Sequence, residues 1–246
     1  MNNIFKNKVV LITGHTGFKG SWLSIWLAGL GAKVVGVSID IPTVPSIFEE
    51  TMLSDHVCDC RIDIQDSDAI RDILLEHQPD FIFHMAAQAL VRPSYSSPLD
   101  TFSVNSLGTV NILEGLRALK KNVTAVMITS DKAYDNVEWI WGYKETDRIG
   151  GKDPYSASKG MAELAIRSYV ESFFNSPDSN VKIGIARAGN VIGGGDWAVD
   201  RIVPDCIRSW SDNKSVDIRK PNATRPWQHV LEPLSGYLSL STALHK

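Results

Sequence analysis

The chain contains 246 residues, of which 43% are hydrophobic and 22% are charged, a composition typical of a globular protein with a substantial core. A formal net charge of −3 excludes a global basic field that would recruit nucleic acid or an anionic membrane surface. The first six residues lack the apolar core of a signal peptide, and the apolar run at 9–12 is too short to span a bilayer, so we expect a cytoplasmic protein.

Short β-branched runs alternate with segments of helical spacing along most of the chain. Strands are expected at 8–12, 33–38, 56–62, 80–84, 123–129 and 181–186. Helices are expected at 20–30, 67–77, 99–119 and 155–174. This alternation predicts right-handed crossovers and an α/β fold with a Rossmann-type, doubly wound parallel sheet.

The character of the sequence changes at residue 190. Glycine, proline and tryptophan become frequent there, and the alternation of strands and helices fades. We therefore expect residues 1–189 to form an NAD-binding Rossmann domain and residues 190–246 to begin a smaller substrate-binding lobe of loops and short elements. The chain ends inside a helical pattern at 233–246, which leads us to expect that this lobe is incomplete.

A glycine-rich loop with the spacing Gly-x-x-Gly-x-x-Gly joins the first strand to the first helix. A tight turn, a close approach of the backbone to a pyrophosphate and tight helix–strand packing all require glycine. Free N–H groups at the helix start would hold the negative charge, so the loop predicts dinucleotide binding; the alternative is a glycine junction that only turns the chain. The expected cofactor contacts are Gly14, Thr16, Gly17, Phe18, Lys19 and Gly20.

Two carboxylates after the second and third strands are candidates for the adenosine half of the cofactor. Asp40 lies about 20 residues past the glycines, where an acid binds the ribose hydroxyls and favours NAD over NADP, although Ser38 is an alternative strand end. Asp63, followed by Ile64, is a candidate for the adenine amino group; alternatively, Asp63 is only a carboxylate at the entry to the next helix, ahead of Ser67. His15, in the glycine loop, is expected to be exposed and without a role.

A Tyr-x-x-x-Lys pair, Tyr155 and Lys159, begins the helix expected at 155–174. The i,i+4 spacing puts the phenol and the ammonium on one helix face. A nearby ammonium is expected to lower the pKa of the tyrosine, so that its phenolate can act as a base near neutral pH. The pair is weak by itself, but behind a glycine loop it predicts hydride-transfer chemistry at a hydroxyl group.

Together, the glycine loop and the Tyr155–Lys159 pair resemble the extended short-chain dehydrogenase/reductase family. The resemblance implies NAD as cofactor and Lys159 as a contact of the nicotinamide ribose. The segment 84–88 is similar to the family's segment that passes the cofactor after the fourth strand, and Asn105 matches the family's helix asparagine, which we expect to be structural. The further cofactor contacts implied are Ala86, Ala87 and Gln88.

Four more stretches narrow the resemblance to the sugar-nucleotide 4,6-dehydratases of this family, and they imply CDP-glucose as the substrate. These stretches are residues 128–136, 139–143, 189–197 and 225–233. The implied reaction is an internal redox cycle, in which Tyr155 takes the proton of the sugar 4-hydroxyl while NAD takes the 4-hydride, water leaves the 5,6-position and the hydride returns to C6. The resemblance also implies a homo-oligomer, a dimer or tetramer, joined through the helices at 99–119 and 155–174.

Three consecutive residues carry the elimination step in this resemblance. It implies Asp131 as the acid for the departing hydroxyl and Ser130 as a hydrogen-bond partner of the 4-oxygen. Lys132 stands where related dTDP-glucose dehydratases have a glutamate base. A desolvated lysine is a possible base, and a charged one would stabilise an enolate, so both roles stay open. The alternative is that these residues only cap a turn at the strand end.

The sugar nucleotide is expected to contact the part of the chain after residue 190. The resemblance implies contacts from Asn190, Arg201, Pro204 and Asp205, and Arg225 is a candidate clamp for the diphosphate. No metal is expected, because Cys58 and Cys60 lack the spacing of a zinc site; they are interpreted, like Cys206, as plain free cysteines.

Three rival functions remain open at this point. A sugar-nucleotide 4-epimerase would use Tyr155 and Lys159 but has no need of an acid–base pair at 131 and 132. A dTDP-glucose 4,6-dehydratase would share the chemistry and differ in the base it recognises. A non-catalytic NAD-binding scaffold would keep the glycine loop without turning substrate over.

Overall fold

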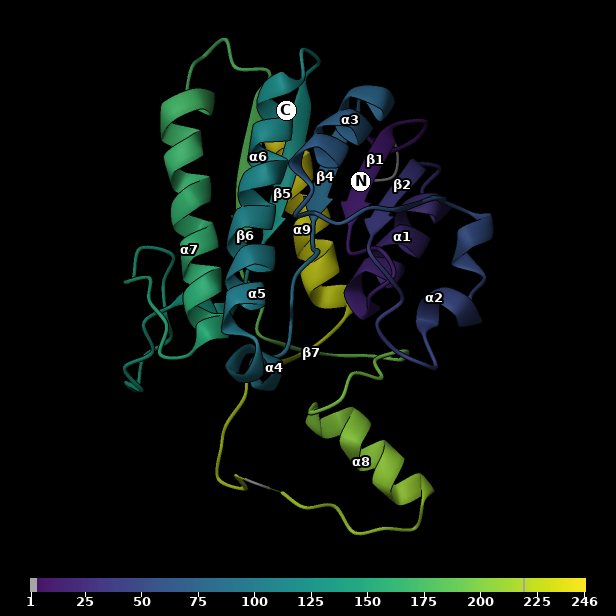
Figure 1. Ribbon diagram of the computed structural model, residues 1–246, viewed down its shortest axis with the longest axis vertical. Coiled ribbons are helices and arrows are strands. Elements are labelled where there is room, and N and C mark those ends of the chain that lie inside the picture. Colours follow the sequence, from purple (N-terminus) through teal and green to yellow (C-terminus); the bar gives the residue numbers. More distant parts are fainter. Residues whose placement is uncertain (1–3, 219) are drawn as a thin grey trace.

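The computed structural model describes residues 4–218 and 220–246; the first three residues of the segment inspected for a signal peptide lie outside this range. Figure 1 shows a parallel sheet with helices on both faces, and an arm below it that carries a separate helix. Within the described residues, no helix is both long and apolar enough to cross a membrane.

All six expected strands form, and they make one parallel sheet in the order β3-β2-β1-β4-β5-β6. The chain builds outward from β1 to β3, returns to the other side of β1 with β4, and continues to β6. This reversal between β1 and β4 confirms the doubly wound fold and creates the crevice where such sheets bind ligands, beyond the strand carboxyl ends. The strands are β1 Val9–Thr13, β2 Lys33–Ser38, β3 Cys58–Arg61, β4 Phe81–His84, β5 Val123–Ile128 and β6 Val181–Ala186.

The expected helices also form, with two departures from regular geometry. The helix expected at 99–119 is divided into α5, a π-helical turn η2 and α6, and the helix expected at 155–174 ends in a second π-helical turn, η4. Short helices α2 and α4 and the 3₁₀ turns η1 and η3 were not predicted, because a few residues carry no readable periodicity. The elements are α1 Phe18–Gly29, α2 Ile47–Glu50, η1 Leu53–Asp55, α3 Ser67–His77, α4 Val91–Ser96, α5 Pro98–Phe102, η2 Ser103–Leu107, α6 Gly108–Ala118, η3 Asp131–Ala133, α7 Pro154–Tyr169 and η4 Val170–Phe174.

Each face of the sheet is covered by its own hydrophobic core. On β1, Leu11 points into the core under α3 and α6, whereas Val10 and Ile12 point into the core under α1. All three side chains are at most 1% exposed. Burial of both faces explains why the strand is apolar at each position from Val9 to Ile12 instead of alternating with polar residues.

The chain after residue 190 leaves the sheet and then returns to it. β7 (Asn190–Ile192) pairs in parallel with β8 (Trp227–His229), and the helix α8 (Ile202–Ser211), which was not predicted, lies on the arm between them (Figure 1). The helix expected at 233–246 forms as α9 (Leu231–His245). Leu234 and Leu238 of α9 are fully buried in the core that covers the α1 face of the sheet. By its packing, α9 therefore belongs to the sheet unit.

Candidate active site

The glycine loop brings the start of α1 against the end of β1 and the loop after β4. Gly14 has a φ of +76°, and a Cβ there would lie 2.8 Å from the amide nitrogen of Ala86. A Cβ on Gly20 would overlap the carbonyl of Gly14, so both positions pack backbone against backbone. Gly17 differs, because a Cβ there would meet only the Gly14 carbonyl oxygen, at 3.4 Å. Its outer side is open to an approaching ligand.

The first turn of α1 has the features of an anion site. Gly17 is the N-cap of the helix and supplies no side-chain hydrogen bond to its amides. No acidic residue occupies this turn. Amides at a helix start have no partner within the helix, and the helix dipole is positive there, so the turn can hold a phosphate.

His15 is buried, contrary to the expected exposure. Its side chain is 0% exposed, its Nε2 lies 3.0 Å from an oxygen of Asp59, and its Nδ1 lies 2.9 Å from the Ser38 hydroxyl. The ring occupies the space above Gly36, where any Cβ would overlap it. Burial lowers the pKa of His15. The residue ties the glycine loop to β2 and β3, and its partners lie too far along the chain to be found from local sequence.

The two adenosine-side carboxylates lie in different settings. Strand β2 ends at Ser38, and Asp40 lies in the following loop with an exposed side chain, while its carbonyl accepts a 2.6 Å hydrogen bond from Thr16. Asp63 accepts hydrogen bonds from the backbone and the side chain of Gln65, at 2.9 and 3.2 Å. The capping of α3 is done by Asp66. Asp63 thus lies at the entry to α3 without capping it, and neither of its two expected roles is excluded.

Thr13, the last residue of β1, holds the loop after β4 in place by hydrogen bonds. The hydroxyl oxygen of Thr13 accepts hydrogen bonds from the amides of Met85 and Ala86, at 3.0 and 3.1 Å. The same hydroxyl lies 2.8 Å from Nδ1 of His84, whose other ring nitrogen lies 3.1 Å from the Thr109 hydroxyl. Burial lowers the pKa of His84 to about 3, so the ring is neutral.

The other end of this loop is fixed by Asn105 in the π-helical turn η2. Its side chain accepts a 2.9 Å hydrogen bond from the Gln88 amide and donates a 3.0 Å hydrogen bond to the Gln88 carbonyl. It also donates to the Ser158 hydroxyl, at 2.9 Å. Asn105 thus joins the loop of Ala86 and Ala87 to α7, as expected of a structural asparagine.

The end of β5 meets the start of α7. The Ser130 hydroxyl donates to Asp131 at 3.0 Å, accepts from the Lys132 amide at 3.2 Å, and lies close enough to Tyr155 to lower the pKa of its phenol. Asp153 caps α7 by accepting from the Ser156 amide at 3.0 Å, which sets the helix start. The segment therefore caps a turn, as the alternative interpretation holds, and at the same time brings Ser130 and Asp131 to the phenol.

Charges in this site differ from the expected pattern. Burial raises the pKa of Tyr155, and the nearby Ser130 hydroxyl opposes that rise only in part, so the expected lowering is wrong. Burial, and then repulsion by Lys19, lower the pKa of Lys159 to about 7. At neutral pH the side chain of Lys159 is therefore only partly protonated, and desolvation disfavours the phenolate form of Tyr155.

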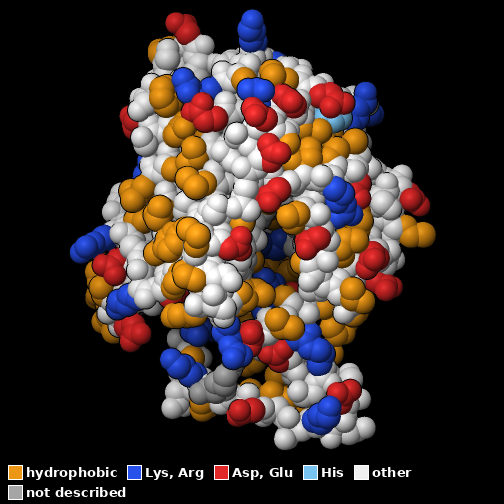
Figure 2. Space-filling view, in the orientation of Figure 1, with side chains coloured by type: hydrophobic (Ala, Val, Ile, Leu, Met, Phe, Trp, Pro, Cys, Tyr) orange, Lys and Arg blue, Asp and Glu red, His pale blue; other side chains and the backbone are white. Residues whose placement is uncertain are grey.

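Lys19, which is half-buried, adds a second cation to the site. Burial and repulsion by Arg201 lower its pKa to about 8, whereas Asp131 opposes that shift. Its ammonium donates a 3.4 Å hydrogen bond to the hydroxyl of Tyr237, from α9. Figure 2 shows a hollow in the middle of the visible face, above the arm with α8, with basic side chains inside it. Such a hollow favours an anionic ligand.

Lys132 is exposed, although a neutral lysine base requires burial. Among the described residues, none shields Lys132 from solvent enough to give the desolvation that a neutral lysine base would need. Lys132 lies beside Asp131 in the η3 turn, one residue before the buried Ala133.

The residues expected to bind the sugar nucleotide are brought together only in part. Arg201 forms a 2.9 Å ion pair with Asp196, and Pro204 lines a cavity of about 150 Å³ in the same segment. Asp205 pairs with Arg208 on α8, and Asn190 begins β7 opposite Trp227. Arg225 lies on the exposed segment between α8 and β8, where it donates to the carbonyl of Thr224. Of these five residues, Arg201 is the one whose charge lowers the pKa of both Tyr155 and Lys19.

Sequence reasoning missed a buried ion pair beneath the site. Glu163, two turns along α7 from Tyr155, is 0% exposed and accepts a 2.7 Å hydrogen bond from Thr129 and a 2.6 Å hydrogen bond from Arg187. The Arg187 guanidinium also lies over the Tyr134 ring, 4.4 Å from its centroid. The pair therefore fixes both ends of the 130–133 segment. An i,i+4 step from Lys159 to Glu163 was the only local sign of it.

Comparison with known proteins identifies sugar-nucleotide enzymes. Residues 11–240 match a family model described as GDP-mannose 4,6 dehydratase. The chain is 51% identical over 246 residues to a CDP-glucose 4,6-dehydratase of Salmonella typhimurium, which covers 99% of this chain and 68% of that protein. It is 30% identical over 178 residues to a GDP-mannose 4,6-dehydratase of Vibrio cholerae, covering 68% of this chain and 46% of that protein. The chain thus spans about two thirds of the first relative and less than half of the second.

Solved structures share the fold at lower identity. A UDP-glucose 4-epimerase of Thermotoga maritima superposes with a TM-score of 0.81 at 22% identity, over 94% of this chain and 72% of that one. An epimerase of Methanothermobacter thermautotrophicus gives a TM-score of 0.83 at 23% identity, over 99% of this chain and 71% of that one. These likenesses confirm the doubly wound architecture.

Proposed function

Because the chain belongs to the GDP-mannose 4,6 dehydratase family, we propose that it dehydrates a sugar nucleotide, CDP-glucose, to CDP-4-keto-6-deoxyglucose and water. The observation that carries the proposal is the grouping of the hydrogen-bonded Ser130 and Asp131 beside the phenol of Tyr155, in a chain 51% identical to a CDP-glucose 4,6-dehydratase. An oxidation needs only the serine and the tyrosine, whereas an elimination also needs the carboxyl group.

The cofactor of the proposed reaction is NAD. The open side of Gly17 and the uncapped first turn of α1 fit a pyrophosphate, and the exposed carboxylate of Asp40 fits ribose hydroxyls. The loop of Ala86, Ala87 and Gln88, and Asp63 with Ile64, are the further proposed contacts. When bound, NAD accepts the hydride from C4 of the sugar and returns it to C6.

In the proposed first step, Tyr155 removes the proton of the 4-hydroxyl and Ser130 hydrogen-bonds the 4-oxygen. Burial raises the pKa of Tyr155, and the neighbouring Ser130 hydroxyl, which lowers that pKa, is the group in this chain that eases the proton transfer. Lys159, with a pKa of about 7, is proposed to contact the nicotinamide ribose.

In the proposed second step, the new 4-ketone makes the 5-hydrogen acidic and water leaves. Solvent takes up the proton from C5, and Asp131 in its protonated form gives a proton to the departing 6-hydroxyl, which leaves as water; the Asp131 carboxylate then regains a proton from solvent. The exposure of Lys132 favours its role as a cation that stabilises the enolate over its role as a neutral base. Asn190, Arg201, Pro204, Asp205 and Arg225 are proposed to hold the sugar nucleotide, and Arg201 has the best support because its charge reaches Tyr155 and Lys19.

Incubation with CDP-glucose and NAD tests the proposed function. We expect a 4-keto-6-deoxy product, seen by mass loss of water and by its ketone absorbance, from the chain but not from Tyr155→Phe. A 4-epimerase would instead return a hexose that keeps its 6-hydroxyl, and a scaffold would bind NAD and release unchanged CDP-glucose. Parallel reactions with dTDP-, UDP- and GDP-glucose test the base, and faster dehydration of dTDP-glucose would contradict the proposed substrate.

We further propose a homo-oligomer joined through α5, α6 and α7. Figure 2 shows hydrophobic side chains gathered on this side of the molecule, on the left of the view. Leu99, Leu107 and Leu164, from these helices and η2, are 83%, 59% and 57% exposed. Light scattering coupled to gel filtration should give at least a dimer for the chain and a monomer for Leu164→Glu.

The proposed division of the chain follows its packing. Residues 1–189 together with the returning helix α9 bind NAD, and the segment from 190 to 230 begins the substrate-binding part. A cytoplasmic location is also proposed, supported by three free cysteines, which are typical of reducing compartments. Recovery in a periplasmic or membrane fraction would contradict it.

A further inference from the structure

Two cysteines lie side by side on the open edge of the sheet. Strand β3 is an edge strand, and the pleat turns Cys58 and Cys60 to one face and Asp59 to the other. The register supports this, because Cys58 and Cys60 lie beside Val35 and Val37 of β2, whose side chains point into the core under α3. The two sulfur atoms are 3.7 Å apart.

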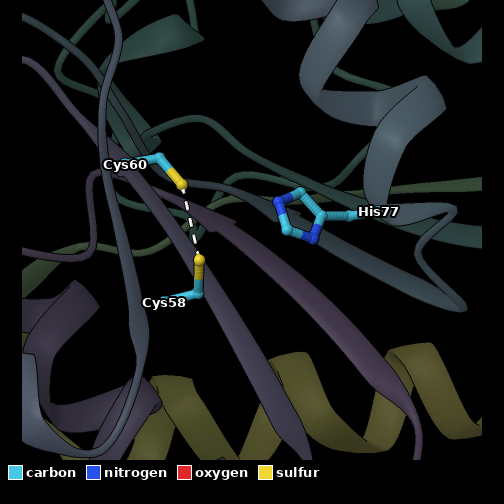
Figure 3. A group of neighbouring side chains, drawn as sticks. All are labelled: Cys58, Cys60 and His77. Carbon is cyan, nitrogen blue, oxygen red and sulfur yellow. Dashed lines mark hydrogen bonds between the residues drawn. The ribbon is translucent and has the colours of Figure 1, made fainter.

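The last residue of α3 completes a cluster with them. His77 follows Ile73 and Leu74 by four and three positions, so it lies on the helix face that packs against the sheet. One ligand atom from each of Cys58, Cys60 and His77 lies within 4.8 Å of the other two. Figure 3 shows the imidazole of His77 turned toward both sulfur atoms.

We propose that Cys58, Cys60 and His77 bind a zinc ion that clips strand β3 to the end of helix α3. Tetrahedral zinc with zinc–sulfur bonds of about 2.3 Å holds two thiolate sulfurs about 3.8 Å apart, close to the observed separation. Two thiolates and one imidazole are a ligand set that favours zinc over magnesium or calcium. The fourth position is taken by water, since Cys58 is exposed to solvent.

The surroundings of the cluster favour a cation. The carboxylates of Glu76 and Asp59 act on Cys60 through their negative charge. The C-terminal end of α3, where the helix dipole is negative, carries His77. Zinc binding displaces the protons of both thiols to the buffer, so the affinity for zinc rises with pH.

The clip lies at the base of a proposed cofactor contact. Strand β3 ends at Arg61, and Asp63 and Ile64 follow it directly before α3 begins at Ser67. An ion that joins the start of β3 to the end of α3 therefore restrains both elements that flank Asp63 and Ile64, and with them the loop that these two residues occupy. This consequence rests on the proposed NAD site, whereas the metal site itself does not.

Binding of Co²⁺, a visible stand-in for zinc, tests the site on the reduced, chelator-treated chain. We expect a single ion per chain, with thiolate-to-cobalt charge-transfer bands and the strong visible absorption of tetrahedral cobalt, both removed by added Zn²⁺. Cys60→Ser and His77→Gln should each weaken Zn²⁺ binding by about tenfold or more. His77→Cys should retain it, because a third thiolate is also a zinc ligand.

Matched variants separate the cluster from non-specific binding. Cys206→Ser and His56→Gln change a half-exposed cysteine and an exposed histidine outside the cluster and should leave Zn²⁺ binding unchanged. Hydrogen exchange of the amides in 58–61 and 75–78 should slow on zinc addition in the unmodified chain and not in Cys60→Ser. Absent charge-transfer bands, or equal losses in the control and cluster variants, would overturn the proposal without bearing on the dehydratase.

Discussion

Single residues in the site are governed by burial more than by their neighbours in sequence. Lys159 and Tyr155 are buried and Lys19 is half-buried, and the pKa of each shifts chiefly because loss of solvent disfavours the charged form. Glu163 keeps its charge compensated by Arg187. The functional state of each group therefore depends on the partner that reaches it from another element.

Substitution of Glu163 tests that dependence. Glu163→Leu leaves Arg187 buried without its carboxylate, and one partner removed from a buried pair costs about 3–5 kcal/mol in the free energy of unfolding. Glu114→Leu, which breaks a half-exposed pair with Arg117, should cost no more than about 1 kcal/mol. Urea unfolding of both variants measures the difference. Equal losses would show that Glu163 is not held as a charged partner.

Lys132 offers a second test at this scale. An electrostatic role predicts that Lys132→Arg keeps exchange of the 5-hydrogen with solvent, because it keeps the charge, and that Lys132→Met loses it by a factor of about 10²–10³. A base role predicts loss in both variants, because arginine does not release its proton. Mass spectrometry of the product formed in deuterated water distinguishes the two roles.

The stability of the chain should depend on pH through His84. Burial lowers its pKa from 6.5 to about 3, so between these values the unfolded chain binds a proton that the folded chain does not. Its stabilising contribution is complete above pH 6.5 and is lost as the pH falls toward 3, with a slope of about 1.4 kcal/mol per pH unit.

Unfolding free energies of the chain and of His84→Gln between pH 5 and 6.5 measure this slope. In His84→Gln the slope of the unfolding free energy against pH should be smaller by nearly the amount that one proton contributes. In His56→Gln, which changes an exposed position, the slope should equal that of the unmodified chain. An unchanged slope in His84→Gln would assign the acid sensitivity to other groups.

At the scale of elements, the junction between β1 and α1 uses its glycines for two purposes. Gly14 and Gly20 allow the helix to pack on the strand and on the loop after β4, and Gly17 leaves a surface open. The π-helical turn η2 likewise joins separate elements, because it places Asn105 in hydrogen-bond contact with both the loop after β4 and helix α7. The proposed cofactor site therefore depends on contacts between the end of β1, the start of α1, the loop after β4 and helix α7.

Two alanine substitutions separate the purposes of the glycines. Gly20→Ala would drive a Cβ into the Gly14 carbonyl, so we expect loss of stability by several kcal/mol or failure to fold. Gly17→Ala finds space in the fold, so its stability should change by less than about 1 kcal/mol while its affinity for NAD falls at least tenfold. Thermal unfolding and NADH fluorescence titration measure the two effects. Full NAD affinity in Gly17→Ala would place the pyrophosphate elsewhere.

At the scale of the whole molecule, the chain closes its own core with its last helix. After the arm with α8, α9 returns to the face of the sheet that α1 also covers (Figure 1). Gly184 of β6 leaves room for this helix, because a Cβ there would lie 2.8 Å from Leu244. The helix also supplies Tyr237, which reaches Lys19 in the site. Cofactor crevice and C-terminal helix are thus parts of one folding unit.

Core truncations in α9 test its place in that unit. Leu238→Ala, at a fully buried position, should lower the free energy of unfolding by about 2–5 kcal/mol. Leu231→Ala, at a position 40% exposed on the same helix, should lower it by less than about 1 kcal/mol. A single cooperative transition monitored by tryptophan fluorescence and by far-ultraviolet circular dichroism is expected for both. Equal effects would mean that α9 is not part of the core.

The sequence by itself determined the six strands, the four long helices and the doubly wound sheet, because local periodicity and the handedness of crossovers specify them. It also singled out the glycine loop and the Tyr155–Lys159 pair, whose spacing is local. Only the tertiary structure decided the burial of His15, the raised pKa of Tyr155 and the exposure of Lys132.

The same holds for features that join distant segments. Glu163 meets Arg187, α9 covers the sheet, and His77 meets Cys58 and Cys60, each across elements that no short window of sequence contains. Burial and pKa depend on every group packed around a side chain, and those groups are chosen by the topology. A pattern along the chain identifies the chemical groups, whereas their charge, exposure and partners exist only once the chain has folded.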